Sequence, residues 1–219
     1  MPTRSEAEEH LRVIRSLMEK ATIYRAISAP TALAGGILAS AGAAALHLLY
    51  PLRSESEFAT PFLLTWGLVL FLTVAANTLL LWLGSKSRGE QFLSSGMRLA
   101  LEAMLPGMLC GLFFSVVLGF GMNVFWLPPI WMMCYAQALL ATKHFAPRSI
   151  MILGWAFLFA GMGSFCLLFF ARFHSRSHWS DFANGSVLLM GLTFGLFHLI
   201  YAACTWPRKP AGVAAGGTP

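Results

Sequence analysis

Residues 190–204, MGLTFGLFHLIYAAC, place a single histidine inside an apolar run that is long enough for most of a membrane-crossing helix. On such a helix Gly191, Gly195, His198 and Ala202 follow the spacing i, i+4, i+7 and i+11, so they share one face. Glycine lets a neighbouring helix approach closely, and close packing of this kind drives helix association in lipid. The stretch therefore predicts a helix whose imidazole points into a bundle.

The whole chain has the composition of a membrane protein. Of its 219 residues, 57% are hydrophobic and only 11% are charged, whereas soluble domains carry about 25% charged residues. A bilayer core needs roughly 20 apolar residues in a helix. Six stretches meet this requirement: residues 28–50, 61–84, 99–120, 124–142, 149–171 and 182–206. Pro128 and Pro129 open the fourth stretch, where a first helical turn tolerates proline. We therefore expect an all-α polytopic fold with one six-helix transmembrane domain over residues 28–206.

The segments that flank this domain have a different character. Residues 1–27 begin with a capping box, Ser5 to Glu8, and continue with apolar residues on one helical face. This pattern predicts an amphipathic N-terminal helix, either in the headgroup plane or docked on the bundle. Residues 207–219 are rich in Gly, Ala and Pro and are expected to form a flexible tail.

The distribution of Lys and Arg predicts the orientation of the spans. If the N-terminus is cytoplasmic, the outer side holds three of the 15 basic residues, and twelve lie on the inner side. The outer three are Arg53, Arg172 and Arg176, and the inner twelve are Arg4, Arg12, Arg15, Lys20, Arg25, Lys86, Arg88, Arg98, Lys143, Arg148, Arg208 and Lys209. The positive-inside rule then places both termini in the cytoplasm. Because these residues flank apolar segments, we expect lipid headgroups as partners and no nucleic acid.

Small residues form faces on three of the spans. They are Gly35 and Gly36 in the first, Gly107 and Gly111 in the third, and Gly191 and Gly195 in the sixth. Such faces are typical of closely packed membrane helices. We expect these three spans at the centre of the bundle, with the Phe- and Trp-rich faces of the second and fifth turned outward.

Four spans place a polar or ionisable side chain in the inner leaflet. At about 1.5 Å per residue, His198, Asn77, Glu102 and Gln137 lie about 12, 10, 6 and 9 Å from the inner ends of their spans. Ionisable residues inside a membrane point to function because their charged forms are expensive there. His198 and Glu102 are candidates for a ligand or proton site, to which Asn77, Gln137 and Tyr135 would add hydrogen bonds. The alternative, simple interhelical hydrogen bonds worth about 0.6 kcal/mol, stays open.

A second constellation lies on the outer side, in RFHSRSHWSD. His174, His178 and Asp181 would share one face of a helical extension, and His47 ends the first span on the same side. Two histidines and a carboxylate suit a divalent metal. Haem is not expected, because His47 and His198 belong to opposite leaflets. The sequence also contains none of the standard motifs of nucleotide-binding proteins, serine hydrolases or zinc proteases. Apart from this possible metal we predict no cofactor.

Residues 11–36, LRVIRSLMEKATIYRAISAPTALAGG, resemble the opening of uncharacterised bacterial six-span integral membrane proteins. The resemblance implies a bacterial inner membrane and no particular activity. Three function classes follow from the residues. The first is a channel or carrier for a small solute, ion or proton that uses the inner polar layer. The second is an accessory, assembly or sensory subunit that binds itself or a larger membrane complex, and the third is a metal-dependent membrane enzyme.

Overall fold

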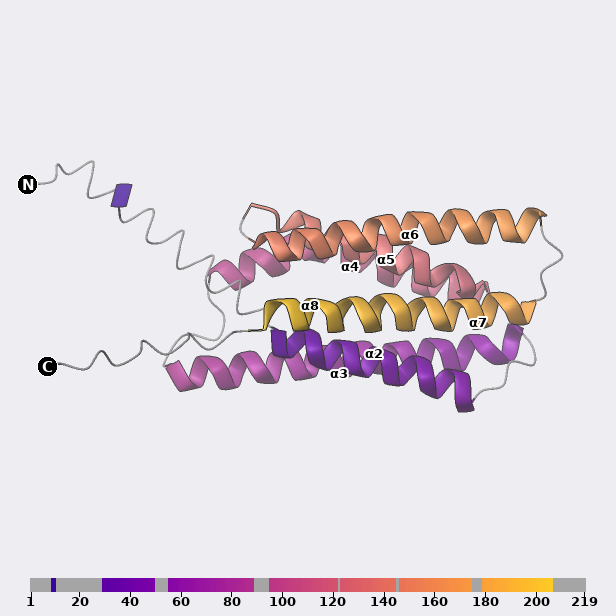
Figure 1. The fold of residues 1–219 in the computed structure, drawn as a ribbon, viewed down its shortest axis with the longest axis horizontal. Helices are drawn as coiled ribbons and strands as arrows, with labels where there is room; N and C mark the ends of the chain where they lie inside the picture. The colour runs from indigo at the N-terminus through magenta and orange to yellow at the C-terminus, as the bar shows by residue number, and fades with distance from the viewer. Residues whose placement is uncertain are drawn as a thin grey trace, which may run out of the picture.

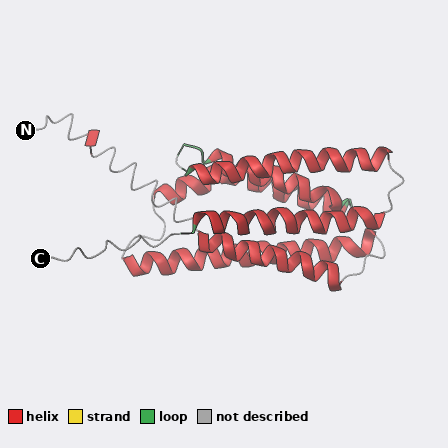
Figure 2. Cartoon of the chain, in the orientation of Figure 1, coloured by secondary structure: helices red, strands yellow, loops and turns green. Residues whose placement is uncertain are grey.

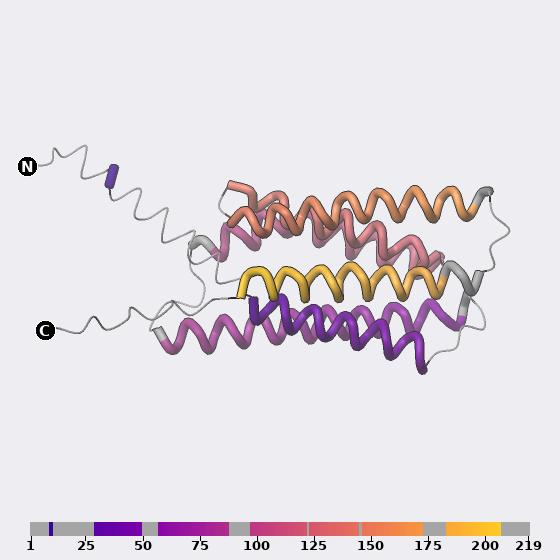
Figure 3. Tube along the Cα trace, viewed as in Figure 1, coloured from indigo at the N-terminus to yellow at the C-terminus, as the bar shows by residue number. Residues whose placement is uncertain are grey.

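The computed structural model describes residues 9–10, 29–49, 55–88, 95–121, 123–144, 146–174 and 179–206, and within these ranges it is helical with no strand (Figure 2). The helices are α2 (Ala29–Leu49), α3 (Glu55–Arg88), α4 (Ser95–Phe120), η1 (Val124–Trp126), α5 (Leu127–Ala141), α6 (Arg148–His174), α7 (Trp179–Met190), η2 (Gly191–Phe197) and α8 (His198–Thr205). The last three elements form one continuous rod (Figure 3).

The expectation of six long apolar helices is confirmed. Six helical segments are long and apolar enough to cross a membrane: Ala29–Leu49, Glu57–Ser87, Met97–Phe120, Val124–Ala141, Arg148–Arg172 and Ala183–Thr205. Each overlaps a predicted span. The predicted amphipathic helix over 1–27, apart from residues 9–10, and the tail over 207–219 lie outside the described residues.

The fourth span begins as its two prolines predict. Pro128 and Pro129 occupy the first turn of α5, directly after the short 3₁₀ helix η1. Proline has no N–H to donate, and a first turn has no intrahelical acceptor for one, so the helix loses no hydrogen bond. Both rings are fully buried, which places the start of α5 inside the protein.

The six spans pack as two groups (Figure 1). In one group α5 packs against α4 and α6, and in the other α2 packs against α3 and against η2 and α8. Packing between the two groups is much sparser. The end of the bundle where α2 begins and α8 ends is here called the inner end, and the opposite end the outer end (Figure 1).

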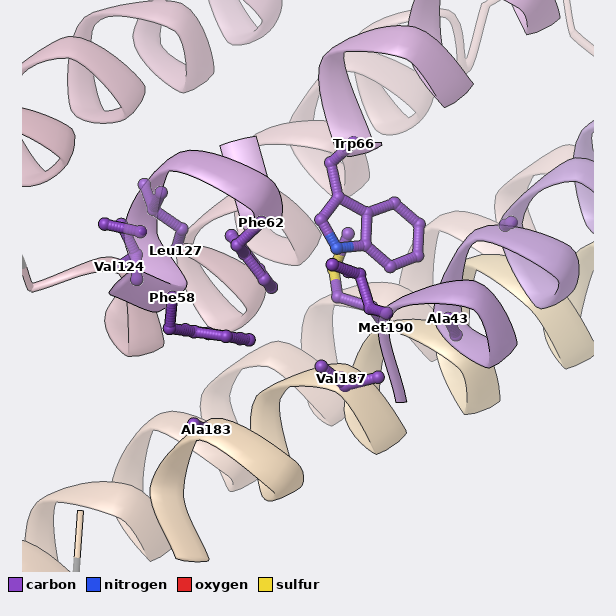
Figure 4. Packing of buried hydrophobic residues seen from close by; sticks show 12 residues of the cluster. Ala43, Phe58, Phe62, Trp66, Val124, Leu127, Ala183, Val187 and Met190 are labelled. Atoms are coloured by element: carbon purple, nitrogen blue, oxygen red, sulfur yellow. The ribbon is translucent and has the colours of Figure 1, made fainter. Parts of the chain in front are cut away.

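The buried core has an outer and an inner part. The outer part centres on Phe58, Phe62 and Trp66 of α3, which pack against η1 and α7 (Figure 4). The inner part holds Met132, Phe157 and other residues of α5, α6, α2 and α8. Both parts combine residues of the two helix groups, so the groups meet through apolar contacts at both ends.

The expected arrangement of the bundle is corrected in two respects. Aromatic side chains of the second and fifth spans do not all turn outward, because Phe62 and Trp66 of α3 and Phe157 of α6 are buried in the core.

The second correction concerns the centre of the bundle. The fourth span is the most buried, with 50% of its most apolar 18-residue window inside the protein, whereas the third span has 11%. The small face of the third span packs on α5: a Cβ at Gly107 would lie 2.7 Å from the Cys134 carbonyl oxygen, and one at Gly111 would lie 3.6 Å from the Cys134 Cβ. The third span is therefore peripheral, because α5 covers the face that was expected to meet the first and sixth spans.

The first and sixth spans pack through their small residues. A Cβ on Gly36 would lie 3.0 Å from the Leu199 backbone nitrogen, and one on Gly195 would lie 2.5 Å from the Ser40 Oγ. Gly191 faces Ala43 in the same way, at 3.0 Å. Gly35 instead faces Thr73 of α3. Glycine at these positions thus brings α2 close to the helix that carries His198.

The Gly107 contact generates a stability prediction. Gly107→Ala places a methyl group against the α5 backbone, which cannot move as a side-chain tip can, and overpacking of this kind costs about 1–3 kcal/mol. We expect a lower melting temperature of the detergent-solubilised protein. Gly163→Ala on α6 is the matched control, because nothing lies within 4 Å of its Cβ position. Equal melting temperatures for the two variants would contradict the close α4–α5 contact.

Candidate functional site

His198 follows directly on a π-helical segment. η2 covers Gly191–Phe197, and α8 begins at His198. π-helical turns are rare and occur frequently at functional sites because they widen the helix and redirect its hydrogen bonds. The amide N–H of His198 bonds with the Gly195 carbonyl, and the Thr193 hydroxyl donates to the Leu189 carbonyl at 2.7 Å. The helix thus departs from regular backbone bonding exactly where its ionisable residue stands.

Both imidazole nitrogens of His198 have partners. Nδ1 lies 2.9 Å from the Phe194 carbonyl oxygen, and Nε2 lies 2.9 Å from the Tyr135 hydroxyl. A carbonyl oxygen only accepts, so Nδ1 carries the hydrogen and donates it. In the neutral ring Nε2 is then the acceptor, and the Tyr135 O–H donates to it. The contacts therefore select one tautomer of the neutral imidazole.

The hydrogen bond between Tyr135 and His198 joins the two helix groups. Tyr135 belongs to α5, and His198 begins α8, the helix that packs on α2. The two rings come from positions 63 residues apart in the chain. A polar contact thus crosses the sparse junction between the groups.

Phenylalanine rings surround this pair. The Phe157 centroid lies 5.0 Å from that of Tyr135 and 5.5 Å from that of His198. Phe194 lies 5.6 Å from Tyr135 and 6.4 Å from His198, and Phe197 lies 5.3 Å from Phe157. The surroundings of the pair are therefore aromatic and apolar.

Asn77 takes part in a separate interaction. The Thr31 hydroxyl of α2 donates to the Asn77 Oδ1 of α3 at 3.1 Å. Both helices belong to the same group, so this bond strengthens one group and does not bridge the two. Asn77 is half-buried.

Glu102 and Gln137 point away from the interior. The Glu102 side chain is 60% exposed and accepts from the Arg98 Nε at 3.0 Å, one turn earlier on α4. Gln137 is exposed on α5. Two residues in an α-helix differ by about 200° in direction, so Gln137 leaves α5 on the side opposite to Tyr135. Of the five expected polar residues, the structure brings together Tyr135 and His198 and leaves the other three apart from them.

A further pair of hydroxyl groups, not among the sequence candidates, lies beside this site. The Tyr201 hydroxyl is 3.4 Å from the Ser149 Oγ of α6. Tyr201 follows His198 by three residues, a spacing that places two side chains on one helix face. That spacing is the signal in the sequence that could have identified Tyr201, whereas nothing there indicates Ser149.

The expected outer metal site lies largely outside the described part of the chain. His178 falls in the undescribed residues, and the structure describes the backbone but not the side chain of His174 and Asp181. His47 is exposed in the last turn of α2. The metal site stays a prediction.

Comparison with known proteins identifies no relative. No family model, no curated protein and no solved structure matches the chain.

The bond between Tyr135 and His198 should appear as a coupling energy. We expect a double-mutant cycle with Tyr135→Phe and His198→Leu to give about 0.6–1.7 kcal/mol, the range for hydrogen bonds between membrane helices. Unfolding by SDS in mixed micelles provides the measurement. The control cycle pairs Tyr135→Phe with Ser115→Ala, whose hydroxyl contacts Trp131, and should be additive within about 0.5 kcal/mol. Additivity in both cycles would contradict the bond.

Proposed function

We propose that this chain is a six-span integral membrane protein of a bacterial inner membrane that carries a proton or a small polar solute, with His198 and Tyr135 as its binding site. Both termini would lie in the cytoplasm, in accord with twelve of the 15 basic residues on that side. The observation that carries the proposal is the position of an ionisable side chain at the junction between two helix groups.

Histidine is suited to reversible binding in such a place. In water it changes charge near neutral pH, and each of its nitrogens can donate or accept. Here Nδ1 is held by the Phe194 carbonyl, so Nε2 is the nitrogen that can exchange partners. A proton or a polar group that binds Nε2 must replace or reverse the bond with Tyr135. Binding at His198 therefore changes a polar contact between α5 and α8.

The arrangement of the helices supports a moving site. In many carriers, one helix bundle rocks against another around a binding site near the membrane midplane. The two groups here are each well packed and meet through fewer contacts. A change at the Tyr135–His198 bond would thus act on the surface along which such a motion takes place.

Flux through vesicles tests the proposal. We expect wild-type protein in liposomes to dissipate an imposed pH gradient, or to exchange a labelled polar solute, faster than empty liposomes. His198→Ala should reduce this rate at least about ten-fold, because general acid–base groups contribute about 10²–10⁴-fold to proton transfer. Tyr135→Phe should reduce it less, since the imidazole remains. His144→Ala, which removes an exposed imidazole in the turn after α5, should leave the rate unchanged.

Two outcomes would contradict transport. One is a folded wild-type protein that moves neither protons nor any polar solute tested. The other is equal flux in wild type and His198→Ala.

Exposed Gln137 favours the second candidate function, an accessory subunit of a larger complex. An amide on an outward helix face can form hydrogen bonds with a neighbouring membrane protein. Absence of flux, together with a detergent-stable complex that Gln137→Leu disrupts, would support that role.

A further inference from the structure

Polar side chains near His198 are unevenly distributed along the bundle. Towards the inner end lie the Tyr201 and Ser149 hydroxyls, which are 3.4 Å apart. Towards the outer end, Phe194 lies one turn before His198 on the same rod. Phe157 of α6 packs against the rings of Phe194 and His198. Hydroxyl groups can both accept and donate a proton, whereas phenylalanine rings can do neither. Two hydroxyl groups therefore lie on the inner side of His198, and phenylalanine rings lie on its outer side.

These hydroxyls connect the level of His198 with the inner end of the bundle. Ser149 is the second residue of α6, next to Arg148, which is exposed. Tyr201 is buried on α8 one turn from His198. At about 1.5 Å per residue, Ser149 and Tyr201 each lie within about 6 Å of the inner end of their helices. The Ser149–Tyr201 pair thus lies on the inner side of His198, between its level and the exposed start of α6.

On this basis we propose that His198 takes up a proton from the inner end of the bundle by way of Ser149 and Tyr201, and not from the outer end. The inference rests on the proposed function and names its substrate as the proton. One hydronium at the inner end gives up one proton and becomes water. Hydroxyl groups along the route each accept one proton and pass one on, so they end unchanged. Nε2 gains the proton, and its new N–H donates to the Tyr135 oxygen after that hydroxyl turns.

The helices packed around His198 are α2, α5, α6 and the rod from α7 to α8, and their described residues place no Asp, Glu, Lys or Arg at its level. α2 and α5 contain none of these residues, and the charged residues of α6, Arg148 and Arg172, lie near its two ends. Asp181 lies in the first turn of α7, 17 residues before His198. Tyr135 from α5 and Tyr201 from α8 are the titratable neighbours of the imidazole. The other near neighbours of the imidazole are the rings of Phe157 and Phe194, which do not titrate.

The rate at which His198 becomes protonated tests this route. The full-length protein in lipid nanodiscs is exposed to a rapid acid jump from a photoacid, and the imidazole band is followed by time-resolved infrared spectroscopy with labelled histidine. Subtraction of the His198→Ala signal isolates His198. We expect Ser149→Ala and Tyr201→Phe each to slow protonation about ten-fold or more, without a change in its final extent.

Ser164→Ala is the matched control. Ser164 lies in the outer half of α6, the helix that also carries Ser149. Its hydroxyl donates to the Gly161 carbonyl of the same helix. This variant should protonate at the wild-type rate. Unchanged rates in both inner variants, equal slowing by Ser164→Ala, or a wild-type His198 that never becomes protonated would overturn the inference.

This experiment also separates the inference from transport. It requires no flux, so a protein that fails in the liposome assay but shows slow protonation in the two inner variants would retain the inner route and lose the carrier function. Should Tyr201→Phe fail to fold, Ser149→Ala decides alone, because its side chain is small and lies at the end of α6.

Discussion

An imidazole can reside inside an apolar bundle only when its nitrogens have partners, since an unpaired polar group buried there costs several kcal/mol. His198 meets this requirement with one backbone carbonyl and one tyrosine hydroxyl. The carbonyl belongs to the π-helical segment before it, and the hydroxyl belongs to the other helix group. The hydrogen bonds of one side chain thus link the irregular backbone of the sixth span to the junction of the bundle.

Close packing by small residues makes this placement possible. Gly36, Gly191 and Gly195 bring α2 against the rod that carries His198. Gly107 in the same way brings α4 against α5, the helix that carries Tyr135. Each group is thereby held together by backbone proximity, whereas the groups meet through apolar side chains and a few polar contacts, among them Tyr135–His198 and Ser149–Tyr201. That difference is what we expect of two bodies that move relative to each other.

Hydropathy and length predict the six long helices and their approximate bounds. The geometry of proline predicts that Pro128 lies in a first helical turn. The depth of a side chain also follows from counting residues, so Tyr135 and His198 can be assigned to nearby levels. Direction around the helix cannot be counted in this way, because it depends on which neighbour covers which face. Glu102 and Gln137 accordingly lie at the expected depth but on exposed faces. Neither the hydropathy nor the residue spacing of the sixth span indicates its π-helical segment.

The protonation state of the two His198 nitrogens decides whether the imidazole is held between the Phe194 carbonyl and the Tyr135 hydroxyl. Nitrogen-15 solid-state NMR of labelled protein in lipid, with the His198 signals assigned by comparison with His198→Ala, measures both at once. At alkaline pH we expect a protonated Nδ1 and an unprotonated Nε2 that accepts a hydrogen bond, and we expect the Nε2 signal to shift in Tyr135→Phe. A protonated Nε2 with an unprotonated Nδ1, or an Nε2 signal that does not change in Tyr135→Phe, would contradict this hydrogen-bonding pattern.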